Sequence, residues 1–246
     1  VANATIQGSQ CTIGWFVDDT KISHLKAAVT DEIIALLESR FGTMTVTRGP
    51  EHMFLGMKIT FHGDGTASIC MPSYIQEAID ESGLHISKQS PTPCASSLLT
   101  IDPVSPVLPT KRARTFHSIV AKLIYVGTRA QTDILLALGF LCSRVSNPTE
   151  QDEKKLRRLL EYLSGTKDMP LRLGADSLSQ FMTWVDASFA VHDDMRSHTG
   201  GVISFGRGGI LCKSKKQKIN TKSSTEAELI GASDYLPHTL YVKLFM

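Results

Sequence analysis

Two adjacent acidic residues, Asp18 and Asp19, interrupt a strand-like stretch near the start of the chain. Mostly apolar residues run from Cys11 to Val17 and resume at Ile22, which predicts two short strands joined tightly at the acids. Such a turn holds two carboxylates side by side, where they repel each other unless solvent or a divalent cation neutralises them. The pattern therefore predicts a β-hairpin whose tip is either an ordinary acidic turn or a metal-binding site.

Helix and strand signals alternate over the next seventy residues. The elements that they predict are a helix over 30–42 capped by Thr30, strands over 44–48, 53–61 and 66–71, and a helix capped by Ser73 and Gln76 that ends at Gly83. Gly56 lies inside the second of these strands, where glycine costs stability unless a ligand or another backbone approaches closely. Gly56 therefore marks either a bulge or a binding position.

A proline-rich segment follows, because five of the ten prolines lie between Ile86 and Thr110. Such a segment cannot hold a regular helix or a central strand, so it is the clearest predicted domain boundary. Beyond it, the hydrophobic period predicts a helix ending near Gly127, a second over 133–145 and a third over 149–162. The outward face of the third is basic, which is typical of a solvated face and is also suited to phosphates; it carries Lys154, Lys155, Arg157 and Arg158.

A second set of acids follows near the end of the sequence. Asp186 lies in an alternating strand over 180–190, strands over 200–206 and 209–213 come next, and a helix with a capping group begins at 223. Carboxylates that converge from different elements can hold the divalent ions that hydrolyse phosphodiesters. Glu226 and Glu228 are two positions apart on that helix, so only one of them can face Asp186. Residues 192–194 read as an exposed acidic turn.

Charge and cysteine content narrow the class of protein. The net charge of +2 does not indicate nucleic-acid binding by itself, but residues 207–222 hold six basic residues and no acid. This basic run could bind a nucleic-acid backbone, and it is equally typical of a strand edge that lysines protect from pairing with another chain. Five scattered cysteines without a Cys-x-x-Cys pair argue against a disulfide framework or zinc site, and for a reducing compartment. No signal-peptide pattern or bilayer-spanning apolar run occurs.

Five motifs, taken in order, resemble the reverse transcriptase and ribonuclease H region of copia-type LTR retrotransposon polyproteins. They are Phe16-Val-Asp-Asp19 of the palm, Phe54-Leu55-Gly56-Met57 of the primer grip, Thr128-Arg129-Ala-Gln-Thr-Asp133-Ile and Tyr162-Leu-Ser-Gly-Thr of the thumb and connection, and Ser223-Ser-Thr-Glu-Ala-Glu-Leu229 of ribonuclease H. The resemblance implies catalytic roles for Asp18, Asp19, Asp186 and Glu228, with Mg²⁺ held by Asp18, Asp186 and Glu228. It favours Glu228 over Glu226, because the family's acid precedes the leucine. The implied nucleic-acid contacts are Arg129, Lys213, Lys215, Lys216 and Lys218.

The resemblance also implies an α+β fold with three parts. These are part of a palm sheet over 1–86, the linker with a helical thumb and connection over 87–175, and the first part of a ribonuclease H-like domain over 176–246. The expected partners are an RNA/DNA template–primer duplex and, in the full-length enzyme, a deoxynucleoside triphosphate, with no membrane. The expected location is the cytoplasm, within a virus-like particle in an intact element, or the nucleus.

The family pattern is incomplete in this sequence. It also requires an aspartate and a nucleotide-selecting segment before the hairpin, and a later ribonuclease H aspartate. We therefore expect little or no activity of the chain in isolation, since loss of a metal ligand removes several kcal/mol of transition-state stabilisation. The alternatives are a non-catalytic nucleic-acid-binding remnant of a retrotransposon and a decayed reading frame with no selected function.

Overall fold

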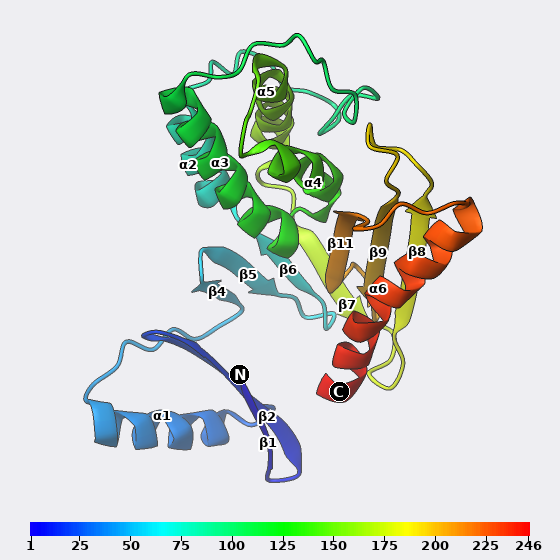
Figure 1. Ribbon diagram of the computed structural model, residues 1–246. Coiled ribbons are helices and arrows are strands. Elements are labelled where there is room, and N and C mark those ends of the chain that lie inside the picture. Colours follow the sequence, from blue (N-terminus) through cyan, green and yellow to red (C-terminus); the bar gives the residue numbers. More distant parts are fainter. The chain divides into compact units, whose positions relative to one another are not determined.

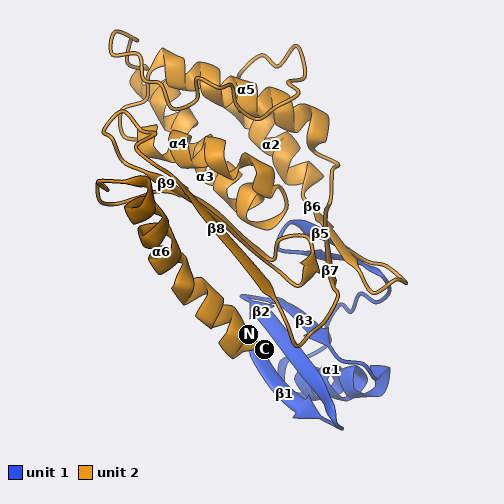
Figure 2. Cartoon of the chain, turned by 90° about the vertical axis from the view of Figure 1, so that its right-hand side faces the viewer, with its two compact units in different colours: residues 1–59 blue, residues 60–246 orange.

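The computed structural model describes residues 1–246, which form two compact units, 1–59 and 60–246 (Figure 2). About 40% of the residues are helical and 24% lie in strands, and the strand pairs are antiparallel, so the predicted α+β class is confirmed. The division between the units falls within a strand, and the predicted domain boundaries near 86 and 176 stay predictions. None of the helices combines the length and apolar character needed to cross a membrane.

The first unit contains an antiparallel sheet and one helix. Its first four elements are β1 (Ala2–Ile6), β2 (Ser9–Phe16), β3 (Asp19–Ser23) and α1 (Ala27–Phe41), and the strands of this sheet have the order β1-β2-β3. The predicted hairpin at the two acids is β2–β3, and β1 is an additional strand. The helix begins three residues before its predicted start, because the Thr30 hydroxyl donates to the Ala27 carbonyl (2.7 Å) instead of capping the helix. Gly42 ends it with a φ of 87°, as predicted.

Two predictions for the segment after α1 are wrong. Residues 44–48 form no strand, and the Met44 amide donates to the side chain of Glu38 (3.1 Å) instead of to a neighbouring strand. The predicted single strand over 53–61 is two strands, β4 (Glu51–Phe54) and β5 (Met57–Phe61). Leu55 and Gly56 both have positive φ, 52° and 73°, as in a two-residue hairpin turn. Gly56 therefore allows a turn and is not a bulge.

Helices form one half of the second unit. They are α2 (Pro72–Ser82), α3 (Thr110–Arg129), the 3₁₀ turn η1 (Thr132–Ile134), α4 (Leu135–Arg144) and α5 (Glu150–Thr166). The apolar stripes predicted for α3 and α5 are buried, including Phe116, Leu123, Leu156, Leu159 and Leu163, except that Ile124, predicted on the same face of α3, is 41% exposed. The predicted Thr149 start of α5 is confirmed by a capping box with Asp152.

Two helix ends differ from prediction. Pro72 occupies the first turn of α2, so Ser73 and Gln76 form no cap, although Gly83 ends the helix in the left-handed conformation as predicted. Helix α3 continues past Gly127 to Arg129. A side chain at Gly127 would lie 2.7 Å from Leu138 Cδ1, so this glycine serves the close packing of α3 on α4.

The proline-rich segment is irregular, as predicted, but it is bound along α5. The Ser90 amide donates to the Glu161 carbonyl (3.3 Å), Lys155 Nζ donates to the Thr100 carbonyl (2.6 Å), and Arg158 Nη2 donates to Thr92 Oγ1 (2.9 Å). Two of the four predicted outward-facing cations are therefore engaged within the chain.

Two small sheets complete the second unit (Figure 1). One contains β6 (Ala67–Cys70), β7 (Leu171–Ala175) and β10 (Gly206–Arg207); the other has the order β11-β9-β8, formed by β8 (Met182–Ser188), β9 (His198–Ser204) and β11 (Leu211–Lys216). Helix α6 (Ser224–Phe245) packs on one face of the second sheet over a core of Ile203, Tyr235 and Val242. Helix α4 lies against β11 on the other face, where Gly139 approaches the Ser214 carbonyl.

Candidate metal and nucleic-acid site

Strand β8 and helix α6 bring two of the predicted acids to one place. Asp186 lies in β8, opposite Gly200 of β9, and Glu228 lies in the second turn of α6. The Ala187 amide, one residue beyond Asp186, donates to Glu228 Oε1 at 3.4 Å. Because β9 lies on one side of β8 and the other side is a free edge, Glu228 meets β8 beside Asp186. Both acids are exposed and accessible to a ligand.

The alternation of β8 separates the directions of the two acids. Ala187 faces α6, since a side chain at Gly231 of that helix would lie 3.5 Å from its Cβ. Asp186, one residue earlier, therefore points to the face that α6 leaves uncovered. Glu228 reaches the strand from the covered side, so the two acids approach β8 from different sides at neighbouring residues.

Glu226 has a different function. Its Oε2 accepts a hydrogen bond from the Lys222 amide (2.6 Å), and its own amide donates to Ser223 Oγ (3.2 Å). This reciprocal arrangement satisfies amides at the start of α6. Glu226 is therefore occupied as a capping residue, which agrees with the preference for Glu228 as the acid near Asp186.

The first pair of acids lies at the tip of the β2–β3 hairpin. Val17 and Asp18 form the turn, and Phe16 pairs with Asp19. Val17 has a φ of 53°, a conformation that a β-branched side chain rarely adopts. Backbone strain of this kind is concentrated at functional sites. Both acids are exposed, and burial lowers the pKa of Lys21, two residues beyond Asp19.

The predicted primer-grip residues, Phe54, Leu55, Gly56 and Met57, form the β4–β5 turn and the strand positions beside it. The thumb and connection motifs, which are thirty residues apart in sequence, are joined directly. Tyr162 donates its hydroxyl proton to Asp133, and Gln131 Nε2 donates to the Thr166 carbonyl (2.5 Å). Burial, together with Asp133, raises the pKa of Tyr162 to about 12.

Arg129, a predicted nucleic-acid contact, belongs to an aromatic and basic cluster on α2 and α3. Its guanidinium lies 3.8 Å from the centre of the Tyr125 ring, which in turn lies 5.4 Å from the Tyr74 ring. Lys122 lies over Tyr74 and forms an ion pair with Glu81 (2.5 Å). Such clusters can stack on bases and attract phosphates.

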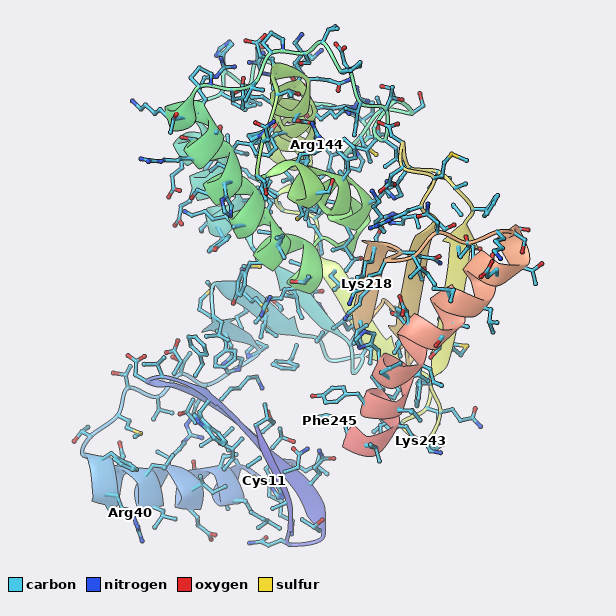
Figure 3. All side chains as sticks on the ribbon, in the orientation of Figure 1. Cys11, Arg40, Arg144, Lys218, Lys243 and Phe245 are labelled. Carbon is cyan, nitrogen blue, oxygen red and sulfur yellow. The ribbon has the colours of Figure 1, made fainter.

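The predicted lysines after β9 do not act as one group. Lys213 hydrogen-bonds His238 of α6 (2.7 Å), and burial lowers the pKa of Lys213. Lys216 forms an ion pair with Asp194 (2.7 Å). Lys215 is exposed on β11. Lys218, labelled in Figure 3, is exposed in the segment between β11 and α6. Of the four predicted lysines, Lys215 and Lys218 therefore remain most available to a phosphate.

The sequence did not predict a buried histidine pair beside the sheet. His192 Nε2 and His198 Nδ1 are 3.0 Å apart, and His198 Nε2 lies 2.7 Å from Ser214 Oγ. Burial, followed by the effect of His192, lowers the pKa of His198 to about 4. The predicted exposed turn carries Asp193 and Asp194, while His192 of the same turn is buried.

The carboxylates of Asp186 and Glu228 are oxygen ligands of the kind that Mg²⁺ binds, but they are only two. Across the whole chain, no group of three or more His, Cys, Asp or Glu side chains is placed to hold a metal ion. Mg²⁺ often takes only one or two carboxylates and completes its shell with water and substrate phosphates. Asp186 and Glu228 can therefore provide the protein ligands of an ion that also needs the substrate.

Known proteins resemble this chain over most of its length. A putative transposon Ty5-1 protein of Saccharomyces cerevisiae is 28% identical over 224 residues, covering 90% of this chain and 71% of the yeast protein. An uncharacterized mitochondrial protein of Arabidopsis thaliana is 29% identical over 218 residues, 87% of this chain and 86% of that protein. The Pol polyprotein of the tobacco transposon TNT 1-94 is 27% identical over 204 residues, 80% of this chain.

Several of these relatives are retrotransposon proteins. Their similarity over most of the chain supports the prediction from the motifs, that the chain is a fragment of a copia-type retrotransposon polyprotein. It covers 15% of the length of the tobacco polyprotein. No protein-family model and no solved structure matches the chain.

Proposed function

We propose that this chain is part of an RNA-directed DNA polymerase with ribonuclease H, and that it binds an RNA/DNA template–primer duplex. The observation that carries the proposal is the hydrogen bond from the Ala187 amide to Glu228 Oε1, which places the carboxylate of α6 one residue from Asp186 of β8. Phosphodiester chemistry with divalent ions needs such convergence. The similarity to retrotransposon Pol polyproteins supports the same function.

In the proposed mechanism, Asp186 and Glu228 would hold Mg²⁺. Magnesium bound there supplies charge neutralisation and an activated water. Lys215 and Lys218 attract the nucleic-acid backbone through charge, so binding weakens as salt rises. Glu226 keeps the start of α6 in place, which fixes the position of Glu228 two residues later.

In the polymerase part, Asp18 would hold magnesium with Asp19 beside it, and the residues of the β4–β5 turn would support the primer. A deoxynucleoside triphosphate is the substrate of the full-length enzyme. We expect the isolated chain to extend a primed RNA template weakly or not at all, because the resemblance assigns only these two acids to its polymerase site. Extension that requires Mg²⁺ and disappears in Asp18→Ala would contradict that expectation.

The ribonuclease H part is tested by binding. The affinity for a labelled RNA/DNA hybrid is measured at constant ionic strength, with and without Mg²⁺. We expect Mg²⁺ to strengthen binding to the wild type, and Asp186→Asn or Glu228→Gln to remove that gain. Glu226→Gln is the matched control, since this carboxylate is on the same helix and is engaged in capping.

The same measurement identifies the alternative function. Salt-dependent binding that is independent of Mg²⁺ and survives all three substitutions would favour a non-catalytic nucleic-acid-binding remnant. An equal loss in Glu226→Gln would show that the magnesium effect depends on the fold of α6 and not on a carboxylate pair.

A further inference from the structure

We propose that Gln217 is a positioning residue that holds Glu228 beside Asp186. Gln217 directly follows β11 and is 1% exposed, so it acts through other residues and not on a substrate. Its action is to attach the start of α6 to the sheet. The inference rests on the proposed function, because it names the residue that keeps a carboxylate of the proposed site in place.

The side-chain amide of Gln217 joins the sheet to helix α6. Its Nε2 donates to Thr199 Oγ1 of β9 (2.9 Å) and to the Ala227 carbonyl in the first turn of α6 (2.8 Å). Because a carbonyl oxygen only accepts, the contact with Ala227 requires Nε2, and not Oε1, to face the helix. Ala227 is buried and immediately precedes Glu228. The amide therefore holds the helix backbone at the point where the Glu228 side chain leaves it.

These contacts form a closed set with the hydrogen bond that locates Glu228. Thr199 pairs with Ala187 of β8, and the Ala187 amide donates to Glu228 Oε1 (3.4 Å). Helix α6 lies close to both strand residues, since a Cβ at Gly231 would lie 3.3 Å from Thr199 Oγ1 and 3.5 Å from Ala187 Cβ. Gln217 thus holds the helix, which carries the acceptor, against the strand pair that carries the donor.

The capping bonds at the start of α6 have a different function. Those of Glu226 stay within residues 222–226, so they order the first turn without attaching it to the sheet. The backbone amide of Gln217 also donates to the Ser197 carbonyl (2.8 Å), which fixes the chain next to the exposed Lys218. One buried residue therefore anchors both a carboxylate and a cation of the proposed site.

The burial of Gln217 costs part of the stability that its hydrogen bonds provide, because its Oε1 is buried without a hydrogen-bond partner. Gln131 is a second buried glutamine with the same property. Its Nε2 donates to the Thr166 carbonyl, and its Oε1 has no partner. Gln131 joins the segment after α3 to the end of α5, so it is a matched control for the loss of a buried glutamine.

Amide hydrogen exchange of Ala187, followed by NMR without metal or nucleic acid, tests the proposal. We expect Glu228→Ala to speed this exchange about fivefold, the factor for the loss of one modest hydrogen bond. Gln217→Met keeps a side chain of similar length but cannot donate, and it should speed the exchange by a similar factor. Gln131→Met should leave the exchange unchanged.

A second readout is the gain that Mg²⁺ gives to binding of the RNA/DNA hybrid. Gln217→Met should reduce this gain about fivefold, whereas Gln131→Met should retain it. A residue that only stabilised the fold would not change the gain, because the gain is measured on folded protein.

Unchanged Ala187 exchange in Gln217→Met, or equal acceleration in Gln131→Met, would overturn the proposal. Thr199→Val removes one acceptor of the Gln217 amide and keeps a similar shape, so it tests the same link if Gln217→Met does not fold; unchanged exchange there would overturn the proposal too. Faster Ala187 exchange in Gln217→Met, together with no magnesium effect on hybrid binding by the wild type, would contradict the proposed function alone.

Discussion

Two adjacent glycines in β9 should respond oppositely to the same substitution. A Cβ at Gly201 would lie 2.6 Å from Tyr235 Cδ2, whereas a Cβ at Gly200 would meet nothing within 4 Å. Overpacking costs about 1–3 kcal/mol. Movement of Tyr235 also weakens the hydrogen bond that its hydroxyl donates to the Leu211 carbonyl (3.1 Å), which is worth about 1 kcal/mol. Replacing glycine by alanine also stabilises the folded state by roughly 0.4–1 kcal/mol, because it reduces the conformational entropy of the unfolded chain.

The balance predicts that Gly201→Ala destabilises the second unit by about 1–3 kcal/mol and that Gly200→Ala stabilises it by about 0.4–1 kcal/mol. The measurement is urea unfolding followed by Trp184 emission in a Trp15→Phe background, since β8 pairs directly with β9. Equal effects of the two substitutions would refute the packing of α6 on this face of the sheet. Stabilisation by Gly201→Ala would refute the close approach of Tyr235.

Three further predictions concern pH, capping and the link between motifs. The pKa of His198 is lowered to about 4 in the folded chain, so the free energy of unfolding should fall as the pH drops from about 6.5 towards 4. For one proton this fall is at most about 1.4 kcal/mol per pH unit. The His198→Gln variant should show a flatter profile of unfolding free energy over this pH range. Thr149→Ala should lower the free energy of unfolding in urea by about 1 kcal/mol, because it removes the capping box of α5. Thr30→Ala, at a position that does not cap a helix, should lower it by less. Equal losses in the two variants would contradict the capping assignment. Tyr162→Phe should lower the free energy of unfolding by about 1 kcal/mol, because it removes the hydrogen bond to Asp133. It should also remove the phenol titration near pH 12 from the ultraviolet titration curve. An unchanged curve would show that another tyrosine has that pKa.

Local chemistry made part of this fold predictable. The hairpin at Asp18 and Asp19 and the capped start of α5 each follow from a few neighbouring residues, and both are present. Strand β1 was missed because Ala2, Ala4 and Ile6 alternate with polar residues but two of the three are small alanines, and the strand is mostly exposed. The strand over 44–48 was predicted from composition, but a side chain of α1 binds its first amide instead.

The candidate site depended on tertiary placement. Helical spacing showed that Glu226 and Glu228 face differently, but only the contacts with the Lys222 and Ala187 amides distinguish a capping acid from one beside Asp186. The exposure of Trp184 could not be predicted, because an alternating strand does not reveal which of its faces a helix will cover. The pairing of His192 with His198 likewise depends on the turn that folds one back on the other.

The most direct test of the central claim is the binding of Mn²⁺, used in place of Mg²⁺ and counted by electron paramagnetic resonance in the presence of an RNA/DNA hybrid. We expect hybrid-dependent Mn²⁺ binding to the wild type that is lost in Asp186→Asn and, separately, in Glu228→Gln, and is retained in Glu226→Gln. Retention of the ion in either of the first two variants would contradict a site shared by Asp186 and Glu228.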